Sequence, residues 1–499
     1  MNFAALLVVA LSAESMSLSE DNIKLIFGLK LKQFRTAKKL SLTELAEKAG
    51  LSVSYINEIE KGKKYPKAEK ISTLAAALDV SYDKLVSLKL DKQLAPVGEI
   101  LNSRLLEEIP LGLFGIDKVK LIEMISNAPL KVTAFISTIS QVANTYKLTQ
   151  ENFYFAMLRS YQEMNENYFD DLEKAAEKFR SEFDLPTSGI IPSETLRNIL
   201  LDSFGYRVEE NDLSDYPELT HIRSVYIEEA KKILVNARMA ENQKAFLYAK
   251  ELGYQFLEIS GERALMTPWP RATSFDHVLN NSRASYFAGA LLISSEVLVE
   301  QLTEFFARPK WNGNKLLEIL SAYNSSPEMF MLRLLNIIPK CFGLSGMFFM
   351  RYDYKKAENE TSLKKQLHLS RTQNLENVSL LREHCATWAQ EELFPNIGKE
   401  PKASCHRFLT ENGESFTVMA LSRPMKRNPN AALSVMIGFE ETNAFYRKVG
   451  FSKDASIPGV TMAQDERKLK SEAEFRQIQD AMQRLMENEK ASEVSELTD

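Results

Sequence analysis

Residues 40–64, LSLTELAEKAGLSVSYINEIEKGKK, decide the fold of the N-terminal part of the chain. This stretch predicts two short helices joined by a tight turn. Ser41 can cap the first helix, and apolar residues recur along it at helical spacing. Gly50 is expected to end it, because glycine readily adopts the left-handed conformation in which many helices stop.

The second helix of the pair is predicted from Val53 to Lys61, with Ser52 as its N-terminal cap. Its apolar residues Val53, Ile56 and Ile59 are expected to be buried. Gly62 ends the helix and is followed by the basic pair Lys63-Lys64. Two short helices around a glycine turn have the layout of a helix-turn-helix, whose second helix lies in the DNA major groove.

Three more helices are predicted around this pair. One amphipathic helix covers residues 22–38, another covers 68–78 after a turn at Tyr65-Pro66, and Ser81 caps a fifth. Short helix pairs around a glycine are common and usually only pack. The five helices in sequence favour the DNA-binding interpretation over simple packing.

This sequence of five predicted helices resembles the lambda-repressor-like, Cro/C1 type (XRE-family) domain. The segments that carry the resemblance are LTELAEKAGLS, SYINEIEKGKKYP and ISTLAAALDVSYDKL, within Leu25 to Lys89. One departure is Thr43 followed by Glu44, where the family often has glutamine as the second residue of its second helix.

The DNA contacts of this module are predicted from residue type and position. Helix N-termini and lysines favour phosphates, and Asn, Ser and Tyr side chains in the groove can form hydrogen bonds with base edges. The predicted phosphate contacts are Ser41, Thr43, Lys61, Lys63 and Lys64. The predicted base contacts are Ser52, Ser54, Tyr55 and Asn57. Glu44 completes the predicted DNA-binding set.

Length, charge and cysteine content limit the number of domains, the extent of any DNA-binding surface and the redox environment. A chain of 499 residues is too long for one core, so we expect several domains. The net charge is −5, yet Lys24 to Lys70 holds twelve Lys or Arg and five Asp or Glu, so DNA affinity is expected to be local. The cysteines Cys341, Cys385 and Cys405 are odd in number and widely spaced, which favours a reduced, cytoplasmic protein.

The two ends of the chain are expected to lie outside the folded domains. Residues 1–20 are predicted to be disordered or to reflect a mis-annotated start, with translation beginning at Met16. The apolar run Phe3–Leu11 is too short to span a bilayer, and no membrane partner is expected. Residues 461–499 are predicted to form a polar helix and an acidic tail.

Between these ends, the predicted fold class is mainly α and multidomain. The helix-turn-helix domain at 21–90 is followed by a linker at 91–117 and a helical region at 118–185. Several aromatic residues of that region favour core packing or a dimer interface, with a ligand pocket as the alternative. They are Phe153, Phe155, Tyr161, Tyr168 and Phe169.

Residues 186–340 carry a second resemblance. Hairpin strands are predicted at Ser224–Ile227 and Lys232–Asn236, and the segment NQKAFLYAKELGYQFLEI at 242–259 is predicted to be helical. This helix resembles that of the ImmA/IrrE-type zincin-like α+β domain, where a His-Glu-x-x-His pair binds zinc.

The zinc ligands of that family are missing from this chain. Lys250 and Tyr254 occupy the two histidine positions around Glu251, and Asn280 or Asn281 stands where the family has a carboxylate. An ammonium group repels Zn²⁺, so the resemblance implies a metal-free, non-catalytic remnant. No catalytic residue, metal or cofactor is predicted.

The predicted α+β C-terminal domain covers 341–460. Its segments at 383–388, 415–422 and 432–439 resemble the short-chain fatty acyl-CoA regulator (RamB-like) family, which implies a transcription factor that controls acyl-CoA, acetate or propionate metabolism. The family's terminal cysteine-rich segment has no counterpart after Gly450. The pairs His384-Cys385 and Cys405-His406 offer zinc-ligand types, but neighbours on a strand face opposite ways, so a shared site would need loops.

These inferences combine into one functional hypothesis. The chain is expected to be a bacterial transcriptional regulator that binds double-stranded operator DNA as a homodimer and senses a small metabolite, an acyl-CoA being favoured. Two alternatives are a zinc metalloprotease that cleaves a repressor, which the lost histidines disfavour, and a phage or toxin–antitoxin type repressor.

Overall fold

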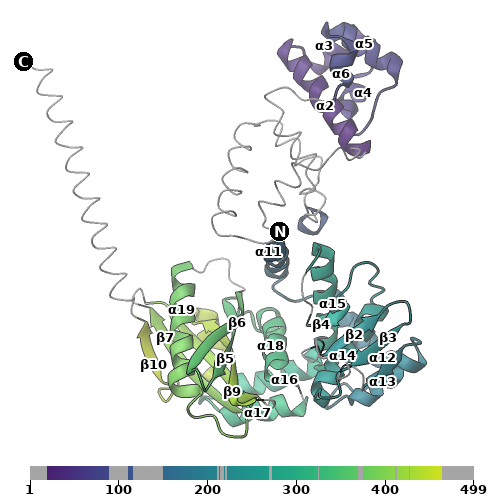
Figure 1. Cartoon of the computed structure of the whole chain (residues 1–499). Helices are drawn as coiled ribbons and strands as arrows, with labels where there is room; N and C mark the ends of the chain where they lie inside the picture. The colour runs from purple at the N-terminus through teal and green to yellow at the C-terminus, as the bar shows by residue number, and fades with distance from the viewer. Residues whose placement is uncertain are drawn as a thin grey trace, which may run out of the picture. The chain divides into compact units, whose positions relative to one another are not determined.

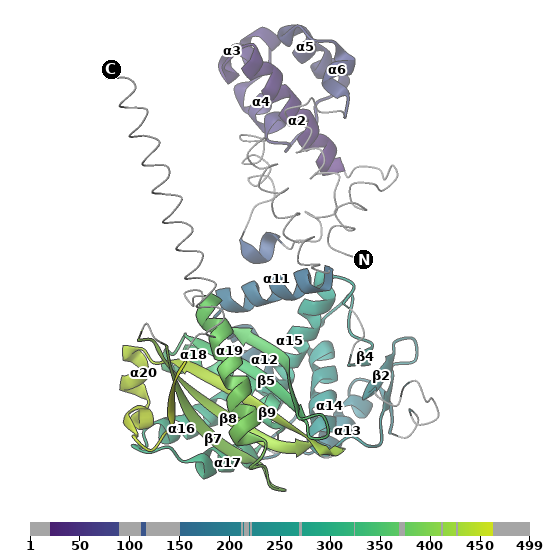
Figure 2. The same ribbon diagram turned by 60° about the vertical axis from the view of Figure 1, so that its left-hand side comes forward.

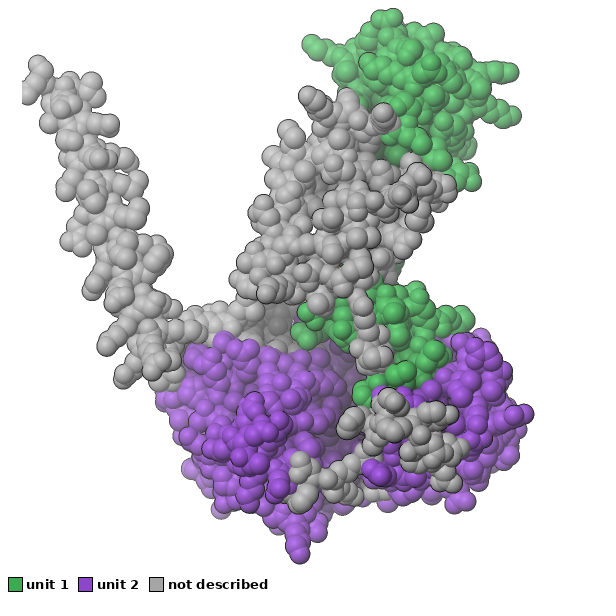
Figure 3. Space-filling model, in the orientation of Figure 1, with its two compact units in different colours: residues 1–161, 260–282 green, residues 162–259, 283–499 purple. Residues whose placement is uncertain are grey.

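The computed structural model of the chain describes residues 20–88, 111–115, 150–210, 213, 219, 222–268, 272–323, 325–368, 375–410, 413–425 and 428–462. Figure 1 shows the helices and strands of the chain, which divides into two compact units (Figure 3). The first comprises residues 1–161 and 260–282, and the second comprises 162–259 and 283–499. As predicted, the protein is mainly helical and multidomain, with sheets in addition.

Some predictions fall outside these residues. They concern the N-terminal 19 residues, the helices expected at 118–149, the polar tail from 463, and the 91–117 linker apart from a short 3₁₀ turn, η1 (Leu111–Phe114). The expected domain boundaries stay a prediction. Within the described ranges, no helix is both long and apolar enough to cross a membrane.

Five helices form the N-terminal domain of the first unit. They are α2 (Glu20–Ala37), α3 (Leu42–Ala49), α4 (Val53–Glu60), α5 (Ala68–Leu78) and α6 (Tyr82–Val86). All five lie where the sequence predicts them. Their apolar stripes meet in one core, in which Leu45, Ile56 and Leu74 are fully buried.

Gly28 lets α2 and the end of α4 approach closely. A Cβ atom at this position would lie 2.2 Å from the Ile59 carbonyl oxygen and 2.9 Å from that of Glu60. Only a residue without a side chain fits such a backbone contact. The position of α4 in the domain therefore depends on this glycine.

The first unit also contains a small second core. It is built from α11 (Gln150–Met164) and the beginning of α15 (Phe275–Leu292), and the short strand β4 (Met266–Thr267) lies in the same unit. Phe153, Phe155 and Tyr161 pack against this core, whereas Tyr168 and Phe169 pack against the main core of the second unit. Packing of these aromatics against cores agrees with the first of the two favoured explanations, core packing or a dimer interface.

The second unit begins with α12 (Asp170–Glu182), α13 (Ser193–Asp202), β1 (Arg207–Glu209), β2 (Ser224–Ile227), β3 (Lys232–Val235) and α14 (Glu241–Phe256). β2 and β3 form the predicted antiparallel hairpin, and β1 pairs with β3 in parallel. The predicted helix at 242–259 is α14, which packs beside α13.

The rest of the second unit is a six-stranded sheet with helices on both faces. The strands lie in the order β10-β7-β8-β9-β5-β6, and all pairs are antiparallel except β10 with β7. The strands are β5 (Met347–Lys355), β6 (Glu360–His368), β7 (Lys402–Thr410), β8 (Ser415–Met425), β9 (Asn428–Glu440) and β10 (Gly459–Met462).

The helices of this part are α16 (Ser295–Phe306), α17 (Gly313–Ala322), α18 (Pro327–Phe342), α19 (Leu375–Trp388) and α20 (Asn443–Lys448). The π-helical turn η4 (Ala389–Leu393) continues α19, and the 3₁₀ turn η5 (Gly450–Lys453) follows α20. Figure 2 shows α19 lying across the strands. Helices α17 and α18 contact the sheet through β7, β5 and β9.

Side chains of the strands alternate between the two faces, as the pleat requires. Met419 and Leu421 of β8 belong to the large core with α16–α18, whereas Val418 and Ala420 belong to the core under α19. Cys405 packs in the first core and Cys385, on α19, in the second. Because the two sulfurs lie on opposite faces of the sheet, the alternative of a zinc site shared by these pairs is wrong.

Candidate DNA interface

Two serine caps fix the helix-turn-helix. The Glu44 backbone N–H donates to Ser41 Oγ at 3.2 Å, and the Ser41 N–H donates to Glu44 Oε2 at 2.6 Å. The backbone hydrogen bond from Ser41 lowers the pKa of the Glu44 carboxyl. Gly50 ends α3 at φ 59°, and Ser52 Oγ accepts from the Tyr55 N–H at 3.2 Å. Both caps and the glycine stop confirm the sequence prediction.

Apolar contacts fix the core-facing side of helix α4, and an ion pair fixes its C-terminal end. Ile56 and Ile59 are fully buried. Arg35 Nε donates to Glu60 Oε1 at 2.6 Å and its Nη2 to Oε2 at 2.8 Å, while Nη1 donates to the Leu40 carbonyl at 2.8 Å. The hydrogen bond with Glu60 raises the pKa of Arg35. This two-point contact joins α2 to the end of α4 and fixes its orientation.

The outward face of α4 carries a row of polar side chains. Ser54, Asn57, Glu58 and Lys61 share this face, because residues spaced i, i+3, i+4 and i+7 lie on one side of a helix. Ser54 and Lys61 are exposed, and Asn57 and Glu58 are half-buried. Two predicted base contacts, Ser54 and Asn57, thus lie together on the face opposite the core. Ser52 is exposed just before the helix begins.

Val53 contradicts the expectation that it is buried. Its side chain is 40% exposed, whereas Ile56 and Ile59 are fully buried. Successive residues of a helix are 100° apart, so each step of three turns back by about 60° and Val53 stands about 120° from Ile59. Val53 therefore lies at the edge of the apolar stripe that Ile56 and Ile59 place in the core. Periodicity alone did not show which one would be excluded.

Tyr55 lies at the border of the domain core. Its ring is half-buried and packs against the core cluster of the five helices, and Lys64 Nζ lies 5.9 Å from the ring centroid. A lysine above an aromatic face is attracted to the ring. Tyr55 therefore packs on the domain core, and its base contact stays a prediction.

The predicted phosphate contacts are exposed. Lys61, Lys63, Lys64, Ser41 and Thr43 all lie at the surface. Lys64 Nζ forms an ion pair with Glu58 Oε2 at 2.8 Å, and this hydrogen bond raises the pKa of Lys64. Glu58 is a surface residue that the sequence prediction missed. Its spacing of four from Ser54 could have identified it.

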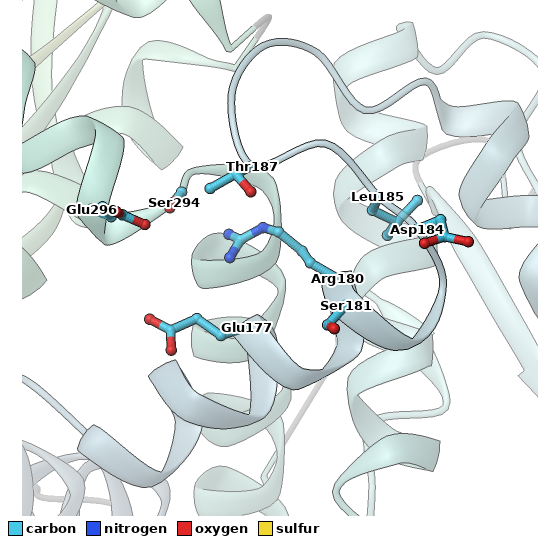
Figure 4. A pocket seen from close by; sticks show the side chains of 8 residues that line it. All are labelled: Glu177, Arg180, Ser181, Asp184, Leu185, Thr187, Ser294 and Glu296. Atoms are coloured by element: carbon cyan, nitrogen blue, oxygen red, sulfur yellow. The ribbon is translucent and has the colours of Figure 1, made fainter.

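The second unit has a different kind of polar site. A cavity of about 540 Å³ opens between α12 and the α15–α16 turn (Figure 4). Its lining residues are Glu177, Arg180, Ser181, Asp184, Leu185, Thr187, Ser294 and Glu296. Arg180 Nε donates to the Leu291 carbonyl at 3.2 Å, and its Nη2 donates to the Ala290 carbonyl. Arg180 therefore completes the hydrogen bonding at the end of α15, and burial lowers its pKa to about 10.

Beside this cavity lies a buried ion pair. Arg333 donates to the two carboxylate oxygens of Glu173 at 2.6 and 2.8 Å and to the Ile293 carbonyl at 3.0 Å. Tyr286 Oη donates to Glu173 Oε1 at 2.7 Å. Burial would raise the pKa of Glu173, but the charge and hydrogen bonds of Arg333 lower it. These contacts join α12, α15 and α18.

The α14 residues predicted to occupy zinc-ligand positions are buried. Lys250 and Glu251 have little exposed surface, and Lys250 Nζ lies 5.7 Å from the centroid of the Tyr254 ring. Asn281 lies on α15, one residue from Asn280. Among the residues that the structure describes, no group of three His, Cys, Asp or Glu side chains could hold a metal ion. The likeness to a zincin remains a prediction.

Comparison with known proteins identifies the N-terminal domain. Residues 31–85 match the family model described as helix-turn-helix. The transcriptional regulator SinR of Bacillus licheniformis is 40% identical over 65 residues, 13% of this chain and 59% of SinR. The transcriptional activator BcrR of Enterococcus faecalis is 33% identical over 90 residues, 18% of this chain and 43% of BcrR.

Two solved structures are also similar. A Mycobacterium tuberculosis transcriptional regulator covers 62% of this chain and 89% of its own, at 17% identity and a TM-score of 0.42. The restriction-modification controller protein C.AhdI from Aeromonas hydrophila is 39% identical over 12% of this chain and 94% of its own, with a TM-score of 0.12. The chain spans about half the length of the curated relatives it matches. The N-terminal segment is an XRE-type helix-turn-helix domain of the kind found in DNA-binding transcriptional regulators.

Proposed function

We propose that the whole protein is a cytoplasmic, sequence-specific transcriptional regulator that inserts α4 into the DNA major groove. The observation that carries this proposal is the outward face of α4. Ser54 and Asn57 lie there in a polar row on a helix whose other side is fixed by Ile56, Ile59 and the Glu60–Arg35 pair. A rigid helix that presents hydrogen-bonding side chains away from its core can read base edges.

Lysines near this face supply affinity for the DNA backbone. Lys61, Lys63 and Lys64 are exposed at or just beyond the end of α4. Such charges release counterions from DNA, so binding should weaken steeply with salt. The capped start of α3 would contact phosphate through Ser41 and Thr43, although the Glu44 carboxylate at the same end opposes an anion.

The operator is proposed to be palindromic and the protein to bind it as a homodimer. One short recognition helix contacts few base pairs, and two copies on inverted half-sites multiply the specificity. The second unit would then set the geometry of the dimer.

The second unit is proposed to sense a small metabolite, an acyl-CoA being the favoured class. This part rests on the resemblance of residues 383–388, 415–422 and 432–439 to the acyl-CoA regulator family. The segment with Lys250 and Tyr254 in the zinc-ligand positions would serve as a metal-free scaffold. The ligand would act by binding one of two conformations more tightly than the other.

Gel-shift titrations with DNA from the protein's own upstream region test the proposal. We expect a shift that Lys64→Glu weakens on every sequence. Lys355→Glu is the matched control, because Lys355 forms an exposed ion pair of the same length, 2.8 Å, with Glu358 at the turn between β5 and β6. Equal weakening by both variants would contradict a role for α4. If no acyl-CoA changes the gel shift, the proposal that the second unit senses an acyl-CoA is wrong, while the proposal of DNA binding stands.

A further inference from the structure

Val53 is an apolar side chain at a position where its neighbours are polar. It is the first residue of α4 and is 40% exposed. Ser52 and Ser54 on either side of it are exposed too. Single exposed apolar residues are normal on protein surfaces, so exposure alone gives Val53 no role. Its place at the start of the recognition helix is what distinguishes it.

The N-terminal residues of a recognition helix are those that reach base edges. In the major groove every base pair presents hydrogen-bonding atoms, but only thymine adds an apolar group, the C5-methyl. A branched aliphatic side chain cannot make the hydrogen bonds available to serine or asparagine. Its favourable contact in the groove is therefore with that methyl group.

We propose that Val53 contacts the C5-methyl group of a thymine and selects for it. This inference rests on the proposed function, because it requires α4 to lie in the major groove. It adds a specificity residue to the predicted base contacts and names the base that this residue selects.

The helix geometry also places this thymine relative to another base. Val53 and Asn57 are four residues apart, and side chains at this spacing have Cβ atoms about 5–6 Å apart. Bases in one strand rise by about 3.4 Å per step. If Asn57 bonds an adenine, the thymine read by Val53 lies one or two base pairs away.

The experiment uses the full chain and the operator that it selects from randomised duplexes. Each thymine is replaced in turn by deoxyuridine, which removes only the methyl group. At one thymine in each half-site the wild-type affinity should fall about fourfold, the effect expected for one buried methyl. Val53→Ala should bind the unmodified operator more weakly and show no further loss at that position.

Val460→Ala is the matched control, because Val460 is also 40% exposed but lies on β10. It should respond to deoxyuridine like the wild type. Circular dichroism of Val53→Ala checks that the domain stays folded. The inference is overturned if no single deoxyuridine weakens wild-type binding, or if Val53→Ala keeps the full response. If the chain selects no sequence at all, the proposed function fails as well, so the two failures are distinguishable.

Discussion

The outward face of α4 and the Glu173 network use polar residues in opposite ways. On α4, Ser54 and Lys61 are exposed, and their hydrogen-bonding groups are available to a partner. In the second unit, Arg333 is 1% exposed and its guanidinium bonds both Glu173 oxygens and a backbone carbonyl. Exposed polar groups on a rigid helix suit recognition, whereas buried and satisfied ones hold helices together.

The strongest test of this contrast is Glu173→Gln. It leaves the Arg333 charge buried without its carboxylate, and losing one partner of such a pair costs about 3–5 kcal/mol of stability. Denaturant unfolding should show this loss. Replacing both residues, as in Glu173→Gln with Arg333→Met, should restore part of it, since no isolated charge remains. A loss below about 1 kcal/mol for the single variant would contradict the structural role.

The same pair should make stability depend on pH. The pKa of Glu173 is lower in the folded chain than in the unfolded chain. A lowered pKa contributes stability above the unfolded value, and this is lost as pH falls through the folded value. The stability difference between wild type and Glu173→Gln should therefore be full at neutral pH and shrink in acid. A stability difference that grows on acidification would contradict the lowered pKa of Glu173 in the folded chain.

On α4 the largest effect is expected from Lys63→Glu with Lys64→Glu. Reversing two charges that are predicted to contact the DNA backbone should reduce affinity on the order of a hundredfold for all DNA sequences and lower the salt slope by about two. Salt titrations of binding measure both quantities. Stability should change by no more than about 1 kcal/mol, because both side chains are exposed and the Lys64–Glu58 pair lies at the surface. Loss of affinity for one sequence alone would place these lysines at bases instead.

The smallest effect is expected when the serine caps of two helices, one in each unit, are replaced and compared. Ser52 Oγ caps α4 and Ser326 Oγ caps α18, each accepting a backbone N–H at 3.2 Å. Replacing either serine by alanine should cost about 1 kcal/mol of stability in its own unit. Only Ser52→Ala should also weaken DNA binding, in parallel titrations of the two variants. Equal effects on DNA would remove the functional distinction between the units.

Most of the helix-turn-helix could be predicted from sequence. Its caps and turn depend on neighbours in the chain, as at Ser41 with Glu44 and at Gly50, so a local pattern contains the whole interaction. Val53 was misplaced because helical spacing defines a stripe without its edges. Which of three apolar residues lies outside the stripe depends on the other helices.

The buried network of the second unit could not be predicted in this way. Glu173 and Arg333 are 160 residues apart in sequence, and Arg180 bonds carbonyls about 110 residues away. No local periodicity relates such residues. Local sequence patterns also could not place the cysteine pairs. Cys385 and Cys405 lie on opposite faces of the sheet because of how α19 packs on it.

Selection of binding sites from randomised duplexes, performed with the wild type and with Asn57→Ala, tests the central claim most directly. The account predicts that the wild type enriches a motif with a fixed adenine. It predicts that Asn57→Ala loses the preference at that position, by about 1–3 kcal/mol of discrimination, while non-specific affinity and salt dependence stay the same. An identical motif from both proteins, or no motif from the wild type, would contradict the reading of DNA by α4.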